Sequence, residues 1–66
     1  MRNFLMKVNE VAKKLEQQGW FLSRIRGSHR QFKHPNRREL VTLSGKLSGD
    51  VPLGTLHSIF KQARFY

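Results

Sequence analysis

The stretch WFLSRIRGSHRQFK, residues 20–33, has the pattern of a β-hairpin and largely decides the fold. Its first half, from Trp20 to Arg26, is rich in aromatic and β-branched residue types and is too short for a helix with one consistent apolar face. Gly27 and Ser28 are predicted to form a two-residue turn, because glycine stands at the position that a type II′ turn favours. The segment from His29 to Lys33 is then the returning strand.

The turn fixes which residues face one another across the hairpin. Three pairs are predicted: Arg26 with His29, Arg24 with Gln31, and Leu22 with Lys33. Because side chains alternate along a strand, these residues and Trp20 share one face, which is mostly basic and exposed. The better core face carries the others, Phe21, Ser23, Ile25, Arg30 and Phe32. The exposure of Trp20 and Leu22 indicates either a patch for a partner or a register shifted by one residue.

Amphipathic helices are predicted before and after this hairpin. The segment from Lys7 to Gln18 repeats apolar residues at i, i+3, i+4 and i+7, and Gly19 supplies its C-cap. The segment from Pro52 to Ala63 has a second apolar stripe, and Pro52 suits a first-turn position. Gly54 weakens this second helix, which moves the expected start of its regular part toward Thr55.

The remaining segments complete one small domain. A third short strand is predicted from Leu40 to Leu43, after a turn at HPNRRE and before a polar loop from Ser44 to Asp50. The order is therefore α-β-β-β-α, and 66 residues hold a single domain, residues 1–66, of the α+β class. Both helices can cover the one apolar face of a three-stranded antiparallel sheet, which leaves the other face open to solvent. The tail from Arg64 to Tyr66 carries two aromatic residues that dock on the core or on a partner.

The charge predicts a polyanionic partner. The net charge is +9, and no acidic residue stands between Glu16 and Glu39. Phosphates are the natural counterpart of such a surface, while an acidic protein remains an alternative. Direct DNA binding by this chain alone is not expected, because neither helix has a basic recognition face. The candidate RNA-binding residues are Arg24, Arg26, Arg30 and Lys33.

Several classes of protein are disfavoured by the composition. No apolar run approaches the roughly 20 residues that span a bilayer, and the N-terminus lacks the cleavage site of a signal peptide. A cytoplasmic protein without a membrane partner is therefore expected. There are no cysteines, and the three histidines have no carboxylate at metal-ligand spacing. Neither a metal site nor a cofactor is predicted.

His29 is the candidate catalytic residue, because it stands among the cations of the hairpin. RNA carries its own nucleophile, the 2′-hydroxyl group, and a histidine can remove the proton of that group near neutral pH. Arginine or lysine can then stabilise the added negative charge at phosphorus. A lone histidine on a strand is nevertheless more often a surface residue, so the residues alone leave catalysis and solvation evenly balanced. The predicted alternatives are a non-catalytic double-stranded RNA-binding module and a subunit whose basic face binds an acidic protein.

The segments GW, GSHRQFKHP, VTL and PLGTLHSIFKQA, in this order, resemble the HicA toxins of bacterial type II toxin–antitoxin systems. The resemblance covers residues from Val8 to Ala63. It implies a fold like that of a double-stranded RNA-binding domain and an mRNA interferase, an endoribonuclease that cuts mRNA. It also implies a HicB-like antitoxin that masks the active site. By the same resemblance His29 is the catalytic histidine, and Gly27 and Ser28 position it.

One segment departs from the family pattern. HicA-like proteins often carry a proline and a second histidine after the third strand, where this chain has Ser44, Gly45 and Lys46. This departure weakens a scheme with two histidines as acid and base, and it also fits a diverged homologue with reduced activity. The leaving group would be protonated by water, by a lysine such as Lys33, or by His29 after it has taken the first proton.

Overall fold

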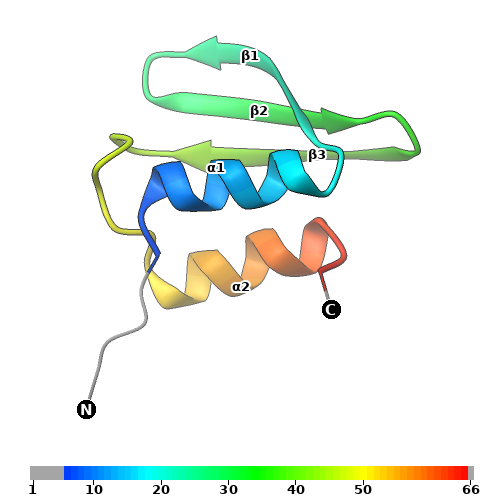
Figure 1. The fold of residues 1–66 in the computed structure, drawn as a ribbon. Helices are drawn as coiled ribbons and strands as arrows, with labels where there is room; N and C mark the ends of the chain where they lie inside the picture. The colour runs from blue at the N-terminus through cyan, green and yellow to red at the C-terminus, as the bar shows by residue number, and fades with distance from the viewer. Residues whose placement is uncertain (1–5, 66) are drawn as a thin grey trace.

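The computed structural model describes residues 6–65 and has the predicted order of elements. The elements are α1 (Val8–Gln17), β1 (Phe21–Arg26), β2 (His29–His34), β3 (Arg37–Ser44) and α2 (Leu53–Gln62). The strands form one antiparallel sheet in the order β1-β2-β3. Both helices lie on the same side of this sheet (Figure 1), so the predicted α-β-β-β-α architecture is confirmed. We call the sheet face opposite the helices the open face.

The core lies between the helices and only part of the sheet. Its buried members come from both helices, from β2 and β3, and from the connecting segments: Val8, Val11, Leu15, Trp20, Phe32, Val41, Leu43, Val51, Leu56, Ile59 and Ala63. No residue of β1 belongs to it, and all six residues of that strand are exposed. Ile25, for example, is 58% exposed although it lies on the helix side of the sheet. β1 therefore extends beyond the layer that the helices cover.

The turn at the end of α1 directs Trp20 into the core. Gly19 has a φ of 95°, in the left-handed region that favours glycine. The backbone N–H of Gly19 donates to the carbonyl of Glu16 at 3.1 Å, and that of Trp20 donates to the carbonyl of Leu15 at 3.0 Å. This pair of bonds is a Schellman motif, which turns the chain back sharply over the helix end. Trp20 is consequently buried, with only 2% of its surface exposed.

The predicted hairpin register is right near the turn and wrong at the far end. The pairs of Arg26 with His29 and of Arg24 with Gln31 are present. Ser23 is an extra residue between the two parts of the ladder, so that Leu22 pairs with Phe32 and Phe21 pairs with Lys33. Such a β-bulge exchanges the faces of the residues beyond it.

Three predictions about which side chain lies on which face of the sheet are wrong. Phe21, expected in the core, lies on the open face and is 48% exposed. Leu22, expected on the open face, points to the helix side, although it remains 42% exposed at the uncovered strand. Trp20, expected to be exposed, is buried.

The third strand is longer than predicted, and the regular part of the second helix begins earlier than the expected Thr55. β3 begins at Arg37, directly after a turn at Pro35 and Asn36, and its pairing with β2 is irregular between Phe32 and His34. The charged residues that suggested a turn belong to an edge strand, where charges are common. α2 begins at Leu53 with Pro52 as its N-cap, so Gly54 lies inside the helix rather than before it.

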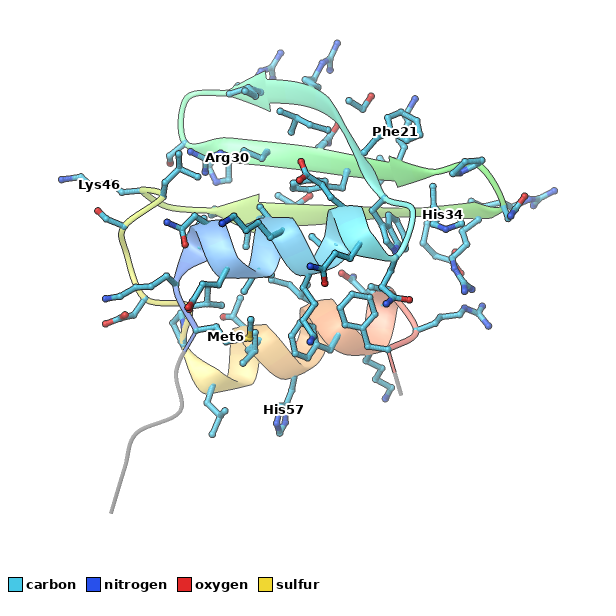
Figure 2. All side chains as sticks on the ribbon, viewed as in Figure 1. Met6, Phe21, Arg30, His34, Lys46 and His57 are labelled. Carbon is cyan, nitrogen blue, oxygen red and sulfur yellow. The ribbon has the colours of Figure 1, made fainter. Side chains whose placement is uncertain are left out.

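His34 connects the β2–β3 turn to the end of α1 (Figure 2). Its Nδ1 accepts a hydrogen bond from the backbone N–H of Asn36 at 3.0 Å. The proton of the neutral ring is therefore on Nε2, which donates to the carbonyl of Gln18 at 3.0 Å. The ring also meets Trp20 edge to face, with 5.2 Å between the ring centroids. His34 is thus a structural residue of the turn.

The C-terminal segment repeats the geometry of the α1 end. Arg64 has a φ of 60°, and the N–H of Phe65 donates to the carbonyl of Phe60 at 2.9 Å. The rings of Phe60 and Phe65 pack with 4.9 Å between their centroids. Phe65 therefore docks on the core, while Tyr66 lies outside the described residues.

Candidate functional site

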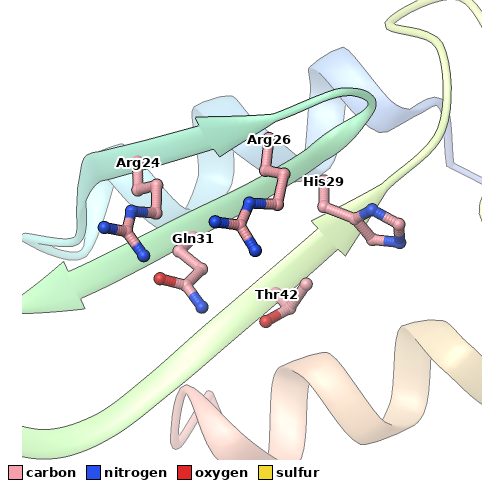
Figure 3. A pocket seen from close by; sticks show the side chains of 5 residues that line it. All are labelled: Arg24, Arg26, His29, Gln31 and Thr42. Atoms are coloured by element: carbon pink, nitrogen blue, oxygen red, sulfur yellow. The ribbon is translucent and has the colours of Figure 1, made fainter.

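A shallow hollow of about 200 Å³ lies on the open face, at the end of the sheet near the first hairpin turn (Figure 3). Its lining side chains come from all three strands: Arg24, Arg26, His29, Gln31 and Thr42. We call it the open-face hollow. It contains three of the residues that the sequence predicted to act together, namely Arg24, Arg26 and His29.

The strand pairing arranges the open face near the turn in two rows that cross the sheet. Arg26, His29 and Ser44 are directly opposite one another on β1, β2 and β3 and form the histidine row. Arg24, Gln31 and Thr42 form the glutamine row in the same way. Residues directly opposite in antiparallel strands have their Cβ atoms roughly 4.5–5.5 Å apart. Each arginine therefore stands next to a different polar residue of the central strand.

The hairpin turn fixes the position of His29. Gly27 has a φ of 60°, while Ser28 has no positive φ, which fits a type II′ turn. This turn sets Arg26 directly against His29. The carbonyl of Ser28 accepts a hydrogen bond from the N–H of Gly45 at 3.1 Å. The turn is thereby fastened to the segment that follows β3.

Arg30 strengthens the same junction from the helix side of the sheet. Its pair with Ile25 and its alternation with His29 place it on the face opposite the hollow. Its Nη1 donates to the carbonyl of Gly45 at 2.7 Å and to that of Ser28 at 3.4 Å. The structure therefore does not bring Arg30 together with Arg24 and Arg26, and its guanidinium group has a structural use.

The sequence predicts Lys33 as a site residue, but it does not predict Gln31 or Thr42. Lys33 lies on this face opposite Phe21, but it does not line the hollow. Gln31 was placed on the basic face by the hairpin register without being chosen as a site residue. Thr42 could have been found only from the register of the third strand, which the sequence does not fix. The hollow is consequently less basic and more polar than predicted.

The arginines of the hollow are not neutralised by carboxylates within residues 6–65. Two acidic side chains form ion pairs elsewhere: Asp50 contacts Lys7 at 2.8 Å, and Glu39 contacts Arg64 at 3.3 Å. Glu10 accepts a hydrogen bond from the backbone N–H of Lys7 at 2.8 Å. The hydrogen bond to Asp50 raises the pKa of Lys7 above 10.5. The pKa of Glu39 is lowered below 4.5, mainly by its own backbone N–H and then by Arg64. The hollow therefore keeps its positive charge.

The described part of the chain contains no group of three or more histidine, cysteine, aspartate or glutamate side chains close enough to hold a metal ion. Within it, neither helix is long and apolar enough to cross a membrane.

Comparison with known proteins assigns the family. The family model described as the HicA toxin of bacterial toxin–antitoxin systems matches residues 8–65, nearly the whole chain. A search of curated proteins finds no significant match. The match includes both helices, all three strands and the open-face hollow. The chain therefore belongs to the HicA family of toxins of bacterial toxin–antitoxin systems.

Proposed function

We propose that this toxin is a metal-independent endoribonuclease that cleaves mRNA with His29 as the general base. The observation that carries the proposal is the position of His29 in a hollow beside Arg24 and Arg26, which have no carboxylate partner among the described residues. An RNA strand in this hollow would have two cations for its phosphate charges, with an imidazole beside one of them. Residue type and electrostatics both suit RNA cleavage.

The proposed reaction uses the substrate's own nucleophile. His29 takes the proton of the 2′-hydroxyl group, and the 2′-oxygen forms a bond to the adjacent phosphorus. Arg26, the direct neighbour of His29, stabilises the extra negative charge of the phosphorane. The bond from phosphorus to the 5′-oxygen then breaks and leaves a 2′,3′-cyclic phosphate.

The leaving 5′-oxygen needs a proton. Lys33 lies outside the hollow, and no second histidine lines it. Of the two remaining donors, water and His29, we propose His29, which carries the proton taken from the 2′-hydroxyl group and returns it to the 5′-oxygen. This transfer restores the neutral imidazole, so the proposed reaction balances its protons without a metal or other cofactor.

The antitoxin partner follows from the family, and we propose that it is HicB-like and covers the open face. A protein that places acidic side chains over Arg24 and Arg26 would bury His29 and exclude RNA from it. Toxin, antitoxin and mRNA would then meet in the cytoplasm, and operator DNA would be bound by the antitoxin rather than by this chain. Solvent-accessible His29 in the toxin–antitoxin complex would contradict this arrangement.

A purely RNA-binding role is the second candidate and has less support. Double-stranded RNA-binding domains grip phosphates largely by shape, commonly with lysines at the start of the second helix. α2 begins instead with the sequence LGTLHS, and its basic residue Lys61 lies in the last turn. Two exposed arginines, Arg24 and Arg26, instead line the hollow together with His29.

The test compares cleavage by the wild-type protein, His29→Ala and His57→Ala. His57 is the matched control, because it is an exposed histidine on α2 that points away from the sheet (Figure 2). Each protein is incubated in EDTA with an end-labelled single-stranded mRNA, and binding is measured separately with a 2′-O-methyl RNA that cannot be cut. Loss of a general base is expected to lower the cleavage rate by about 10²- to 10⁴-fold.

The expected result is cleavage by the wild type and His57→Ala, loss of cleavage in His29→Ala, and similar RNA binding by all three. Cleavage by folded His29→Ala at the wild-type rate would exclude the assigned base. RNA binding without any fragments from the wild type would favour the binding module instead.

A further inference from the structure

The glutamine row is not used by the proposed cleavage step, yet it forms half of the hollow. It consists of a guanidinium group on β1, an amide on β2 and a hydroxyl group on β3. Within residues 6–65, the side chains of Arg24, Gln31 and Thr42 have no hydrogen-bond partner. Gln31 is half-buried on the central strand, and its amide lies between Arg24 and Thr42 in the floor of the hollow (Figure 3). Donors and acceptors of this kind are available to a ligand.

The distance between the two rows suits a polymer with a regular repeat. The rows are two residues apart along each strand, which corresponds to about 7 Å. Successive phosphates of an extended RNA strand are separated by a similar distance. If one phosphate lies at Arg26 and His29, an extended strand following β1 places the next phosphate at Arg24. The sugar and base of that adjacent nucleotide then lie over Gln31 and Thr42.

We propose that Arg24, Gln31 and Thr42 bind the nucleotide adjacent to the scissile phosphate, and that Gln31 gives the toxin a base preference there. Arg24 binds the neighbouring phosphate and carries no sequence information. The amide of Gln31 presents one acceptor and two donors, and can pair with a base edge that offers the complementary pair. The hydroxyl group of Thr42 can bond a ribose hydroxyl group. This subsite rests on the proposed ribonuclease function.

The distinction between Gln31 and Arg24 gives the subsite a specific signature. Loss of a phosphate contact weakens all RNA sequences alike, whereas loss of a base contact changes the ranking of sequences. Gln31→Ala is therefore expected to remove a preference, and Arg24→Ala is expected to lower cleavage uniformly. If the open face bound only an acidic protein, Arg24→Ala would weaken that binding. Gln31→Ala would then have no effect on which RNA sequences are cleaved.

The experiment cleaves a randomised single-stranded RNA with the wild-type protein, Gln31→Ala, Arg24→Ala and Gln17→Ala. The fragments are sequenced, and the base frequencies at the positions on either side of the cut are compared with those of uncut RNA. Gln17→Ala is the matched control, because Gln17 is an exposed glutamine at the end of α1, far from the open face. Thermal melts establish that each variant is folded.

The wild type and Gln17→Ala are expected to favour a base at one neighbouring position by roughly tenfold over its least favoured alternative. Gln31→Ala should reduce this ratio to near one while still cutting RNA. Arg24→Ala should keep the ratio and cut every sequence more slowly. An unchanged preference in Gln31→Ala, or no preference in the wild type, would overturn the subsite while leaving the ribonuclease proposal intact. Absence of cleavage by the wild type would instead refute the ribonuclease proposal and the subsite with it.

Discussion

Replacing Gly19 by alanine should destabilise the fold much more than an ordinary loop substitution. The φ of 95° is unfavourable for any residue with a Cβ atom, at a cost of about 1–2 kcal/mol. A Cβ atom there would also lie 2.8 Å from Nε2 of His34, too close for the ring to stay in place. Displacement of the ring would lose its hydrogen bond to Gln18, about 1 kcal/mol, and its contact with Trp20, about 0.5–1.5 kcal/mol.

These contributions sum to about 2.5–4.5 kcal/mol. A domain of this length has a total stability of about 3–10 kcal/mol, so the melting temperature should fall by more than about 10 °C. The assays are equilibrium unfolding in urea, which gives the free energy of unfolding, and a thermal melt, both followed by circular dichroism. Gly27→Ala is the matched control, because Gly27 also has a positive φ, 60°, but a Cβ atom there would meet nothing within 4 Å. It should cost about 1–2 kcal/mol.

A double-mutant cycle with His34→Ala isolates the steric part of the effect. Without the imidazole ring, Gly19→Ala should cost only about 1–2 kcal/mol, so the two substitutions should be non-additive by about 1.5–2.5 kcal/mol. Equal destabilisation by Gly19→Ala and Gly27→Ala, or additivity in the cycle, would refute the reasoning that the ring is displaced.

Two further substitutions test local features of the fold. Gly54→Ala should raise the free energy of unfolding by roughly 0.5–1 kcal/mol in urea titrations, because Gly54 lies in α2 with open space around it; destabilisation would contradict the helical assignment. Glu39→Gln should lower the melting temperature slightly at pH 7, because the lowered pKa of Glu39 means that its ionised form is stabilised in the fold. That difference should be lost as the pH falls below 4.5, and a difference that persists at about pH 2.5 would exclude this cause.

The elements that the sequence predicted well are those determined by local patterns. The periodicity from Val8 and the position of Gly19 give α1 almost to the residue. The pairing of Arg26 with His29 depends only on the Gly27–Ser28 turn, so the β-bulge farther along the hairpin does not change it. This explains why the arginines and the histidine of the hollow could be placed together from the sequence alone.

The errors begin where pairing depends on distant contacts. The exposure predicted for Trp20 and Leu22 left a register shift open, but no residue type around Ser23 marks where the bulge lies. A single extra residue is enough to exchange the faces of Phe21 and Leu22. The burial of Trp20 requires the packing of the helix end against His34. Thr42 enters the hollow through the irregular pairing of β2 and β3, which no turn residue encodes.

The exposure of β1 separates the lining of the hollow from the packing of the core. Both helices, β2 and β3 supply the buried residues of the elements, whereas β1 supplies the two arginines of the hollow and no core residue. Substitutions at exposed positions usually change stability by less than about 0.5 kcal/mol. Substitutions in β1 can therefore change the lining of the hollow while the buried core is kept. The residues of β1 that we propose to contact RNA are thus not the residues that hold the protein together, so recognition can change without loss of the fold.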